Sequence, residues 1–262
     1  MRVANYLMIN ATIVSGWMLL FWLCSVPVRN VAIVDIAWGL GFVLVAIVSA
    51  LLPSSESVNQ WLMPVMVAIW GCSLSGYLAW RNYGKPEDKR YRAMRDHRGK
   101  AFVYSSLWIV FGLQTVLLWI LALPVQMGIF QTDPGWHLFH LVGIILWLVG
   151  FLFETIGDYQ LARFLCDPDS RGKVMDRGLW KYTRHPNYFG DFLVWWGIYF
   201  VSLAGAAGNW WTVIGPLLIS FLLMRISGVP MLEQNLRLSR PGYAEYARST
   251  NSFFPWWPKQ FP

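Results

Sequence analysis

The chain has 262 residues, of which 56% are hydrophobic and 13% are charged. A soluble domain carries about 25% charged residues, so this composition excludes an ordinary soluble protein and favours a membrane protein. The formal charge of +7 does not indicate nucleic acid as a partner, because the basic residues are confined to the connections between apolar runs.

Seven apolar runs follow one another along the chain, each near the roughly 20 residues that a helix needs to cross a bilayer. We therefore expect an all-α, polytopic membrane protein with about seven transmembrane helices. The sequence has no internal repeat and no low-complexity linker, which predicts a single membrane domain over 1–262. The runs are Tyr6–Val26, Val31–Leu52, Trp61–Trp80, Phe102–Val125, His137–Thr155, Tyr188–Ala204 and Trp210–Met224.

The connections between these runs differ in charge. Placing Arg29 inside also places 81–100, 163–184 and the tail from 225 inside, which gathers 20 of the 21 Lys and Arg residues on that side and leaves Arg2 opposite. The connections without Lys or Arg are 53–60, 126–136 and 205–209. By the positive-inside rule, the N-terminus lies outside and the C-terminus lies in the cytoplasm. We expect a multi-pass protein of a bacterial inner membrane whose active site faces the cytoplasm.

One carboxylate, Asp35, interrupts the second apolar run within Val34–Leu40. A charge at that depth costs at least about 2.5 to 3.5 kcal/mol on insertion scales, so the side chain should face a protein interior or a wet cavity. An interfacial ion pair with Arg29 near the cytoplasmic end of the run is the structural alternative.

Two carboxylates, Glu154 and Asp158, end the fifth run four residues apart. That spacing puts both on one helix face, where like charges repel unless a cation or hydrogen-bond donors separate them. Arg163 is too far along the chain to neutralise both. Donors from another segment, or a ligand rich in hydroxyls and amides, would resolve the conflict, and a helix end fraying into the headgroups is the alternative.

The sixth run opens with basic, aromatic and polar residues over Gly178–Asp191. A proline suits the first helical turn there, and Asn187 and Asp191 then share a face. Backbone N–H groups at this helix start, beside Arg184 and His185, would form an anion site for a phosphate or pyrophosphate. Basic anchors for lipid headgroups would give the same pattern.

A motif within this segment resembles a known family signature. Gly-Leu-Trp-x-Tyr-x-Arg-His-Pro-Asn-Tyr-x-Gly at Gly178–Gly190 is similar to the C-terminal signature of membrane steroid 5α-reductases, sterol reductases and isoprenylcysteine carboxyl methyltransferases. From about residue 30 to the tail, the chain resembles the bacterial branch of the steroid 5α-reductase-like family, a branch of the domain-of-unknown-function type. The further motifs are Glu154-x-x-x-Asp158-Tyr159-Gln160, Glu87-Asp88-x-Arg90-Tyr91, Val34-Asp35-x-x-Trp38-Gly39 and Arg225-x-Ser227-Gly228-x-Pro230-x-Leu232-Glu233.

The resemblance implies a membrane reductase that binds NADPH in a cytoplasm-facing cavity formed by about 81–262. Asp158, Asn187 and Tyr243 match positions at which the reductases hold their cofactor. The whole candidate set for the cofactor is Asp88, Arg90, Tyr91, Glu154, Asp158, Arg163, Tyr182, Arg184, His185, Asn187, Asp191 and Tyr243.

The chain departs from the family pattern at several cofactor positions. Asp191 replaces a glutamate, and Glu154 stands where steroid reductases carry an asparagine. Ala162 and Leu165 stand in place of two arginines, so the cofactor phosphates need other partners. The substitutes that we expect are Arg90, Arg163 and Arg184.

The substrate end also departs from the steroid reductases, which use a Gln-Glu pair on the second helix and a tyrosine on the third. Here Asp35 lies on the second run and Tyr77 on the third, and both are the candidate catalytic residues. We expect them to face one cavity, where the phenol would donate to the oxygen of an enone and the carboxylate would orient it or supply the proton.

The leading expectation is an NADPH-dependent reductase of a C=C bond conjugated to a carbonyl, acting on a hydrophobic lipid, sterol-like or isoprenoid substrate in the bilayer. A membrane methyltransferase using S-adenosylmethionine is the first alternative, because it shares the step Arg184–Tyr188. A non-enzymatic lipid-binding membrane protein is the second. The three cysteines lie far apart without a metal-ligand spacing, so we expect no metal site.

Overall fold

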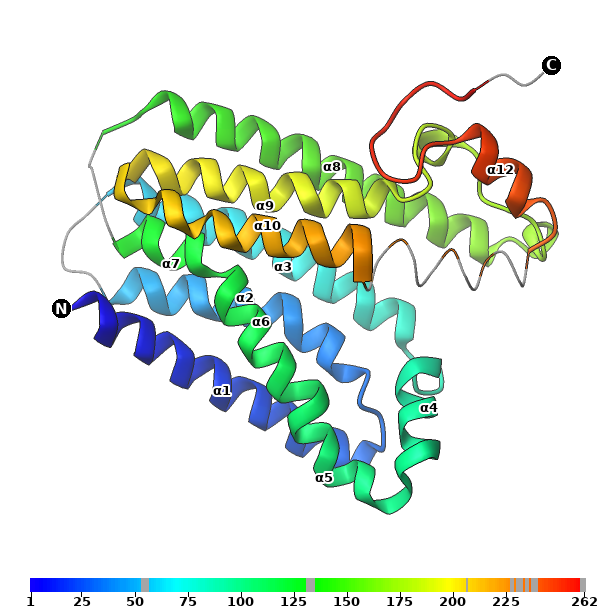
Figure 1. The fold of residues 1–262 in the computed structure, drawn as a ribbon, viewed down its shortest axis with the longest axis horizontal. Helices are drawn as coiled ribbons and strands as arrows, with labels where there is room; N and C mark the ends of the chain where they lie inside the picture. The colour runs from blue at the N-terminus through cyan, green and yellow to red at the C-terminus, as the bar shows by residue number, and fades with distance from the viewer. Residues whose placement is uncertain are drawn as a thin grey trace. The chain divides into compact units, whose positions relative to one another are not determined.

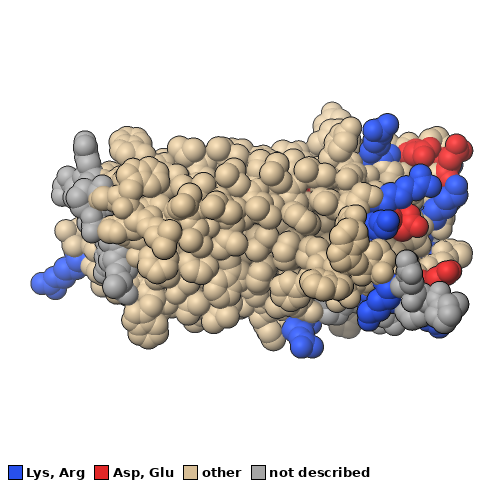
Figure 2. Space-filling model, turned by 90° about the horizontal axis from the view of Figure 1, so that it is seen from above, with Lys and Arg blue, Asp and Glu red and all other residues tan. Residues whose placement is uncertain are grey.

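The structure is a computed structural model that describes residues 1–52, 57–130, 135–205, 207–226 and 240–259, together with Val229, Glu233 and Leu236. Throughout these residues the secondary structure is helical, without β-strands. Six of the described helical segments are long and apolar enough to cross a membrane. On the face seen in Figure 2, a broad uncharged area separates the charged side chains at its margins. The prediction of an all-α polytopic membrane protein is confirmed.

The six segments match six of the seven runs expected from the sequence. They are Val3–Val28, Ile33–Leu51, Val58–Asn82, Lys89–Leu121, Leu138–Cys166 and Gly208–Ile226. The expected run at Tyr188–Ala204 forms helix α9 (Pro186–Gly205), which has 20 residues but does not belong to this set. Its aromatic and polar residues lower its hydropathy, so the number of spans stays a prediction.

The helices belong to two compact units, Met1–Leu138 with Val201–Thr212, and Phe139–Phe200 with Val213–Pro262. Helices of the first unit are α1 (Val3–Val28), α2 (Ile33–Leu51), α3 (Val58–Asn82), α4 (Lys89–Arg98), α5 (Phe102–Ser106), α6 (Leu113–Leu121) and α7 (Leu123–Phe130). Helices of the second are α8 (Leu138–Cys166), most of α9, α10 (Ile214–Phe221) and α12 (Tyr243–Ser249). The single domain over 1–262 stays a prediction.

Small residues set the close packing of α2 against α3 in the first unit. A Cβ atom on Gly39 would lie 2.7 Å from the Gly71 carbonyl oxygen, and one on Gly71 would lie 2.6 Å from the Gly39 oxygen. Ser75 Oγ donates a hydrogen bond of 2.9 Å to the Ile36 carbonyl across the same interface. Interfaces of this kind suit a bilayer, where packing and interhelical hydrogen bonds drive helix association.

Two helix ends differ from the sequence expectations. The connection expected at 126–136 begins as the buried helix α7, which continues to Phe130. Gln126 is fully buried there, and its carbonyl accepts a 2.9 Å hydrogen bond from the Tyr6 hydroxyl. Helix α8 does not end near Asp158 but continues to Cys166. Between Asp158 and Cys166 the sequence has no glycine or proline to interrupt the helix. The helix ends at Cys166 because Asp167 precedes Pro168, and a residue before a proline disfavours the helical backbone conformation.

Helices α8 and α9 run alongside each other in the second unit (Figure 1). Glycines recur every seven residues on the contact face of each helix, at Gly143, Gly150 and Gly157 on α8 and at Gly190 and Gly197 on α9. A Cβ on Gly150 would lie 2.6 Å from the Gly190 oxygen, and one on Gly197 would lie 2.7 Å from the Gly143 oxygen. The two backbones therefore approach to a separation that side chains would prevent.

Candidate active site

The glycine packing of α8 against α9 brings an amide to a pair of carboxylates. Asn187 Nδ2 on α9 donates a hydrogen bond of 3.0 Å to Asp158 Oδ1 on α8. Glu154 and Asp158 share one face of α8 and are 7% and 8% exposed. Asp191, one turn beyond Asn187, interacts electrostatically with Asp158. Asn187 thus supplies a donor of the kind that two carboxylates on one helix face require.

Two acceptor atoms in this cluster are buried without a hydrogen-bond partner among the described residues, Asn187 Oδ1 and Asp191 Oδ1. Leaving a buried polar atom unsatisfied costs about 1 to 3 kcal/mol, so such atoms indicate a missing partner. In the part of the chain that the structure describes, His, Cys, Asp and Glu side chains do not form a group able to hold a metal ion. The cluster is therefore suited to a ligand that carries N–H or O–H donors.

Arg184, directly before α9, is engaged within the protein. Its Nε donates to Glu233 Oε1 at 2.8 Å, and its Nη2 lies 2.6 Å from the same oxygen. Its Nη1 donates to the carbonyl oxygens of Ala247 and Thr250. The expected contact of Arg184 with cofactor phosphates stays a prediction, but these contacts already use most of its donors.

His185 shares the carboxylate of Glu233 with Arg184, with its Nε2 3.4 Å from Oε1. Burial raises the pKa of the Glu233 carboxyl, but the hydrogen bonds to His185 and Arg184 outweigh burial and hold the pKa below its usual value. Burial lowers the pKa of His185 despite the neighbouring carboxylate, so the imidazole is mainly neutral at neutral pH. This buried group joins the start of α9 to the tail of the chain.

The loop between α8 and α9 is fastened to α8 beside Asp158. Trp180 Nε1 donates to the Gly157 carbonyl at 3.0 Å, and Gln160 Oε1 accepts from the Leu179 backbone N–H at 3.0 Å. The Tyr246 hydroxyl on α12 in turn donates to the Trp180 carbonyl. These bonds hold the loop and α12 over the C-terminal part of α8, next to Asp158.

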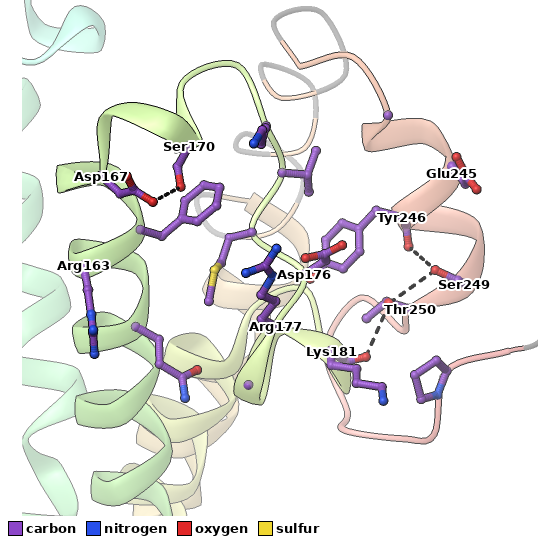
Figure 3. Close-up of a pocket in the computed structure, with 18 of the residues that line it drawn as sticks. Arg163, Asp167, Ser170, Asp176, Arg177, Lys181, Glu245, Tyr246, Ser249 and Thr250 are labelled. Atoms are coloured by element: carbon purple, nitrogen blue, oxygen red, sulfur yellow. Dashed lines mark hydrogen bonds between the residues drawn. The ribbon is translucent and has the colours of Figure 1, made fainter.

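A pocket of about 1550 Å³ lies between the end of α8, this loop and α12 (Figure 3). The basic side chains Arg163, Lys173, Arg177 and Lys181 line it, as do the acidic side chains Asp176 and Glu245. Arg163 is the member of this lining that the sequence identified. Lys181 lies within the signature at Gly178–Gly190 but was not among the candidates, and Arg177 belongs to the connection before that signature.

The remaining aromatic candidates of this unit are Tyr243 on α12 and Tyr182 in the loop between α8 and α9. Tyr243 on α12 is 2% exposed, and its ring centroid lies 6.0 Å from that of Tyr246. Tyr182 is half-buried, with its ring edge-to-face against Trp257 at 5.4 Å. Their contacts with a cofactor stay predictions.

Asp35 on α2 forms a second polar cluster, within the first unit. The Tyr91 hydroxyl on α4 donates a hydrogen bond of 3.2 Å to Asp35 Oδ1, and Arg90 Nη2 lies 3.7 Å from Oδ2. Asp88 caps the N-terminus of α4 by accepting from the Arg90 backbone N–H at 2.9 Å, and it also accepts from Arg90 Nε at 3.0 Å. The motif that contains Asp88, Arg90 and Tyr91 therefore contacts the carboxylate on α2.

Tyr77 was expected to be the phenol that accompanies Asp35. Its ring lies 5.5 Å below the Arg81 guanidinium and 6.1 Å from the Trp80 ring. The phenol that bonds to Asp35 in the structure is Tyr91, which sequence analysis had assigned to the cofactor. A shared cavity for Asp35 and Tyr77 stays a prediction.

The fold and these clusters define a class: an all-α, multi-pass membrane protein with a buried carboxylate–amide cluster between two glycine-packed helices. The chain belongs to the DUF1295 family, described as a protein of unknown function, whose sequence profile matches residues 21–250. This family match, together with the similarity to two 3-oxo-5-alpha-steroid 4-dehydrogenases described next, confirms the resemblance to steroid 5α-reductase-like proteins that the motifs indicate.

Two named relatives show how far the similarity reaches. The chain is 31% identical to human 3-oxo-5-alpha-steroid 4-dehydrogenase 1 over 97 residues, which cover 37% of this chain and 33% of the human protein. It is 26% identical to the rat protein of the same name over 130 residues, covering 50% of this chain and 46% of the rat protein. The chain thus matches between about a third and a half of the length of these relatives. The chain matches no solved structure.

Proposed function

We propose that this protein is an NADPH-dependent reductase of a carbon–carbon double bond conjugated to a carbonyl, in a lipid, sterol-like or isoprenoid substrate. The similarity to 3-oxo-5-alpha-steroid 4-dehydrogenases supports the reaction class. The main support for a bound cofactor is the pair of buried acceptor atoms, Asn187 Oδ1 and Asp191 Oδ1, that have no hydrogen-bond partner among the described residues. The enzyme would work in a bacterial inner membrane with its site facing the cytoplasm, as the basic asymmetry of its loops indicates.

A nicotinamide would match the hydrogen-bonding chemistry of the cluster between α8 and α9. Its carboxamide carries N–H donors, and Asn187 Oδ1 and Asp191 Oδ1 are acceptors without partners among the described residues. NADPH would supply hydride when bound. The role of Asp158 is to hold the Asn187 amide in orientation, and the role of the glycine packing is to keep water out of the space between the helices.

The rest of a dinucleotide fits the neighbouring pocket. Its volume of about 1550 Å³ exceeds the roughly 300 to 1,000 Å³ that is typical of small-ligand sites. Gln160, two residues beyond Asp158 on α8, lines this pocket. Arg163, Arg177 and Lys181 would neutralise the phosphates, and this assignment replaces the contact expected of Arg184 because that guanidinium is occupied by Glu233.

The cluster at Asp35 is the proposed acid of the reaction. A phenol bonded to a carboxylate is held in one orientation, and Tyr91 meets this condition at 3.2 Å. The phenol would donate its proton toward the carbonyl oxygen of the lipid, and Asp35 would orient the phenol. Tyr77 remains a second candidate for the same donation.

Ligand binding by the purified chain in lipid nanodiscs tests the proposed function. We expect the chain to shift NADPH fluorescence on binding and to retain no labelled S-adenosylmethionine. Retention of S-adenosylmethionine in place of NADPH would identify the methyltransferase alternative, whose motif this chain shares at Arg184–Tyr188. Binding of neither compound would leave the lipid-binding alternative and overturn the proposal.

A further inference from the structure

A second pocket, of about 390 Å³, lies in the first unit where α1 ends and α5 begins. Its walls combine two guanidinium groups with apolar side chains, among them Arg29, Arg95, Val26, Phe102 and Val103. It shares none of its lining with the pocket between α8 and α12. The proposed reductase function gives this second pocket no role.

Arg29 has an unusual backbone conformation. Its φ of 51° lies in the left-handed region, and it is the one non-glycine residue with positive φ among those described. Glycine is the usual residue after a helix end in this conformation, and another residue there costs about 1 to 2 kcal/mol. The backbone N–H of Arg29 closes α1 through Ser25 and Val26, a task that needs no guanidinium. The guanidinium of Arg29 therefore takes no part in ending the helix.

Arg95 is fixed beside Arg29. Its Nε and Nη2 donate to the two carboxylate oxygens of Glu87 at 2.8 and 2.7 Å, and its Nη2 also donates to the Arg29 carbonyl at 3.3 Å. Its guanidinium lies 4.8 Å from the centre of the Phe102 ring. Within the described part of the chain, these hydrogen bonds use Nε and Nη2 and leave the N–H groups of Nη1 for a ligand.

The charged groups at this pocket are Arg29, Arg95 and the Glu87 carboxylate bonded to Arg95, and together they leave one net positive charge. Burial raises the pKa of Glu87, but the hydrogen bonds from Arg95 and from the Val31 backbone outweigh burial and hold the pKa below its usual value. Glu87 is therefore ionised at neutral pH and balances Arg95. Arg29 makes no ion pair with any described residue, so its charge is left for a ligand. A singly charged anion would match it.

We propose that this pocket binds the phosphodiester of an anionic membrane lipid, with Arg29 and Arg95 Nη1 on the phosphate oxygens. The apolar wall formed by Val26, Phe102 and Val103 suits the glycerol and upper acyl region of such a lipid. Below the pocket, Leu19 and Leu23 are exposed on α1 at 45% and 53%, and an acyl chain would cover them. A zwitterionic headgroup is disfavoured because its own cation would face both arginines.

Lipid retention by the purified full-length chain tests this site. The probes are dioleoylphosphatidylglycerol, dioleoylphosphatidylcholine and inorganic phosphate, each followed by native mass spectrometry of the chain released from detergent. We expect retention of phosphatidylglycerol over phosphatidylcholine, and a loss of about tenfold in Arg29→Gln, because one charge-assisted hydrogen-bonding partner is removed. Arg29→Lys, which keeps the charge, restores most of the retention.

The matched control is Arg98→Gln, which removes an exposed cation of α4 that does not line the pocket. An equal loss in the control would mean that diffuse surface charge binds the lipid, and would overturn the proposal. Equal retention of both lipids by the wild-type chain, or displacement of the lipid by millimolar inorganic phosphate, would overturn it as well. If Arg29→Gln does not fold, Arg29→Asn replaces it, because asparagine tolerates the left-handed conformation best among polar side chains.

Discussion

Asn187 and Asp158 are joined by a hydrogen bond of 3.0 Å that crosses from α9 to α8. A carboxylate accepts hydrogen bonds and does not donate, so the amide nitrogen of Asn187 must face Asp158 and the amide oxygen must face away. That oxygen and Asp191 Oδ1 are both buried acceptors without a described partner. The chemistry of the cluster therefore favours a ligand that donates hydrogen bonds, as a carboxamide does.

Asp158→Ala should weaken NADPH binding by at least about tenfold, because the Asn187 amide loses the charged partner that orients it, and a hydrogen bond to a charged group contributes about 1.5 to 3 kcal/mol. Asn187→Asp should weaken it further, since it sets two carboxylates against each other across the interface. Isothermal titration calorimetry in nanodiscs measures both. Asp96→Ala, an exposed carboxylate on α4, is the control and should bind normally. Unchanged affinity in both site variants would remove this site.

Gly150→Ala should separate α8 from α9. The new Cβ would lie 2.6 Å from two backbone atoms, the Gly190 oxygen and the Val194 nitrogen, which cannot move independently of their helix. Such overpacking costs about 1 to 3 kcal/mol, so the melting temperature of the detergent-solubilised chain should fall. Gly16→Ala is the control, because a Cβ there meets nothing within 4 Å. Equal melting temperatures for the two variants would contradict the close approach.

Hydropathy and the family motifs were enough to predict the helical class and most of the helices. Periodicity also placed Glu154 and Asp158 on one face and implied a donor from elsewhere. The length of α8 was underestimated because charged residues were taken to end the span, whereas an α-helix continues through them until Asp167-Pro168. The helix α7 was missed because its short run follows α6 directly and resembles a connection by length.

Contacts between side chains that are far apart in the chain could not be predicted from the sequence. The ion pair of Arg184 with Glu233 was not predicted, because the two residues are 49 positions apart in the chain. Tyr91 was assigned to the cofactor from the family motif Glu87-Asp88-x-Arg90-Tyr91, and that assignment stays a prediction. Its hydrogen bond to Asp35, 56 positions earlier in the chain, was not predicted. Spacing along one helix indicates a shared face, but it carries no information on which distant loop covers that face.

The stability of the chain should fall on acidification through Glu233 and His185. The lowered pKa of His185 means that the unfolded chain takes up a proton first, so stability declines as pH falls below the ordinary value of 6.5. The lowered pKa of Glu233 has the same sign, with stability present above 4.5 and lost as pH falls through the folded pKa. Melting temperatures between pH 8 and pH 4 measure this decline.

Variants separate the two contributions to this pH dependence. Glu233→Gln should flatten the part of the profile below pH 4.5, and His185→Gln should flatten the part just below 6.5. His97→Gln, on the exposed face of α4, should keep the wild-type profile. A melting temperature that rises on acidification would show that the buried group is not arranged as described.

The predicted orientation in the membrane rests on the expected topology, which gathers 20 of the 21 Lys and Arg residues on one side. A fluorescent protein fused to the C-terminus should fluoresce, and alkaline phosphatase fused there should be inactive. An active phosphatase fusion would reverse the orientation and place the proposed cofactor site outside the cytoplasm.

Two phenols compete for the role of proton donor, and the structure gives them different surroundings. The Tyr91 hydroxyl bonds to Asp35 Oδ1, whereas the Tyr77 ring contacts Arg81. Losing a donor that acts only in the transition state typically costs about 10² to 10³ in rate, so Tyr91→Phe should lower turnover by this factor and leave NADPH affinity unchanged. The measurement is NADPH consumption with a conjugated lipid enone, alongside calorimetry on the same preparation.

Tyr77→Phe and the exposed Tyr104→Phe complete the comparison. If the carboxylate contact selects the acid, then Tyr91→Phe alone loses turnover, and Tyr104→Phe matches the wild type because its ring is 75% exposed. A loss confined to Tyr77→Phe would restore the pairing expected from the sequence and would mean that Tyr91 serves the structure of α4. Asp35→Asn distinguishes these cases further, because it keeps an acceptor for Tyr91 but removes the charge that fixes the phenol. Full turnover in Asp35→Asn together with full turnover in Tyr91→Phe would exclude this cluster from the chemistry while leaving the cofactor site between α8 and α9 untouched.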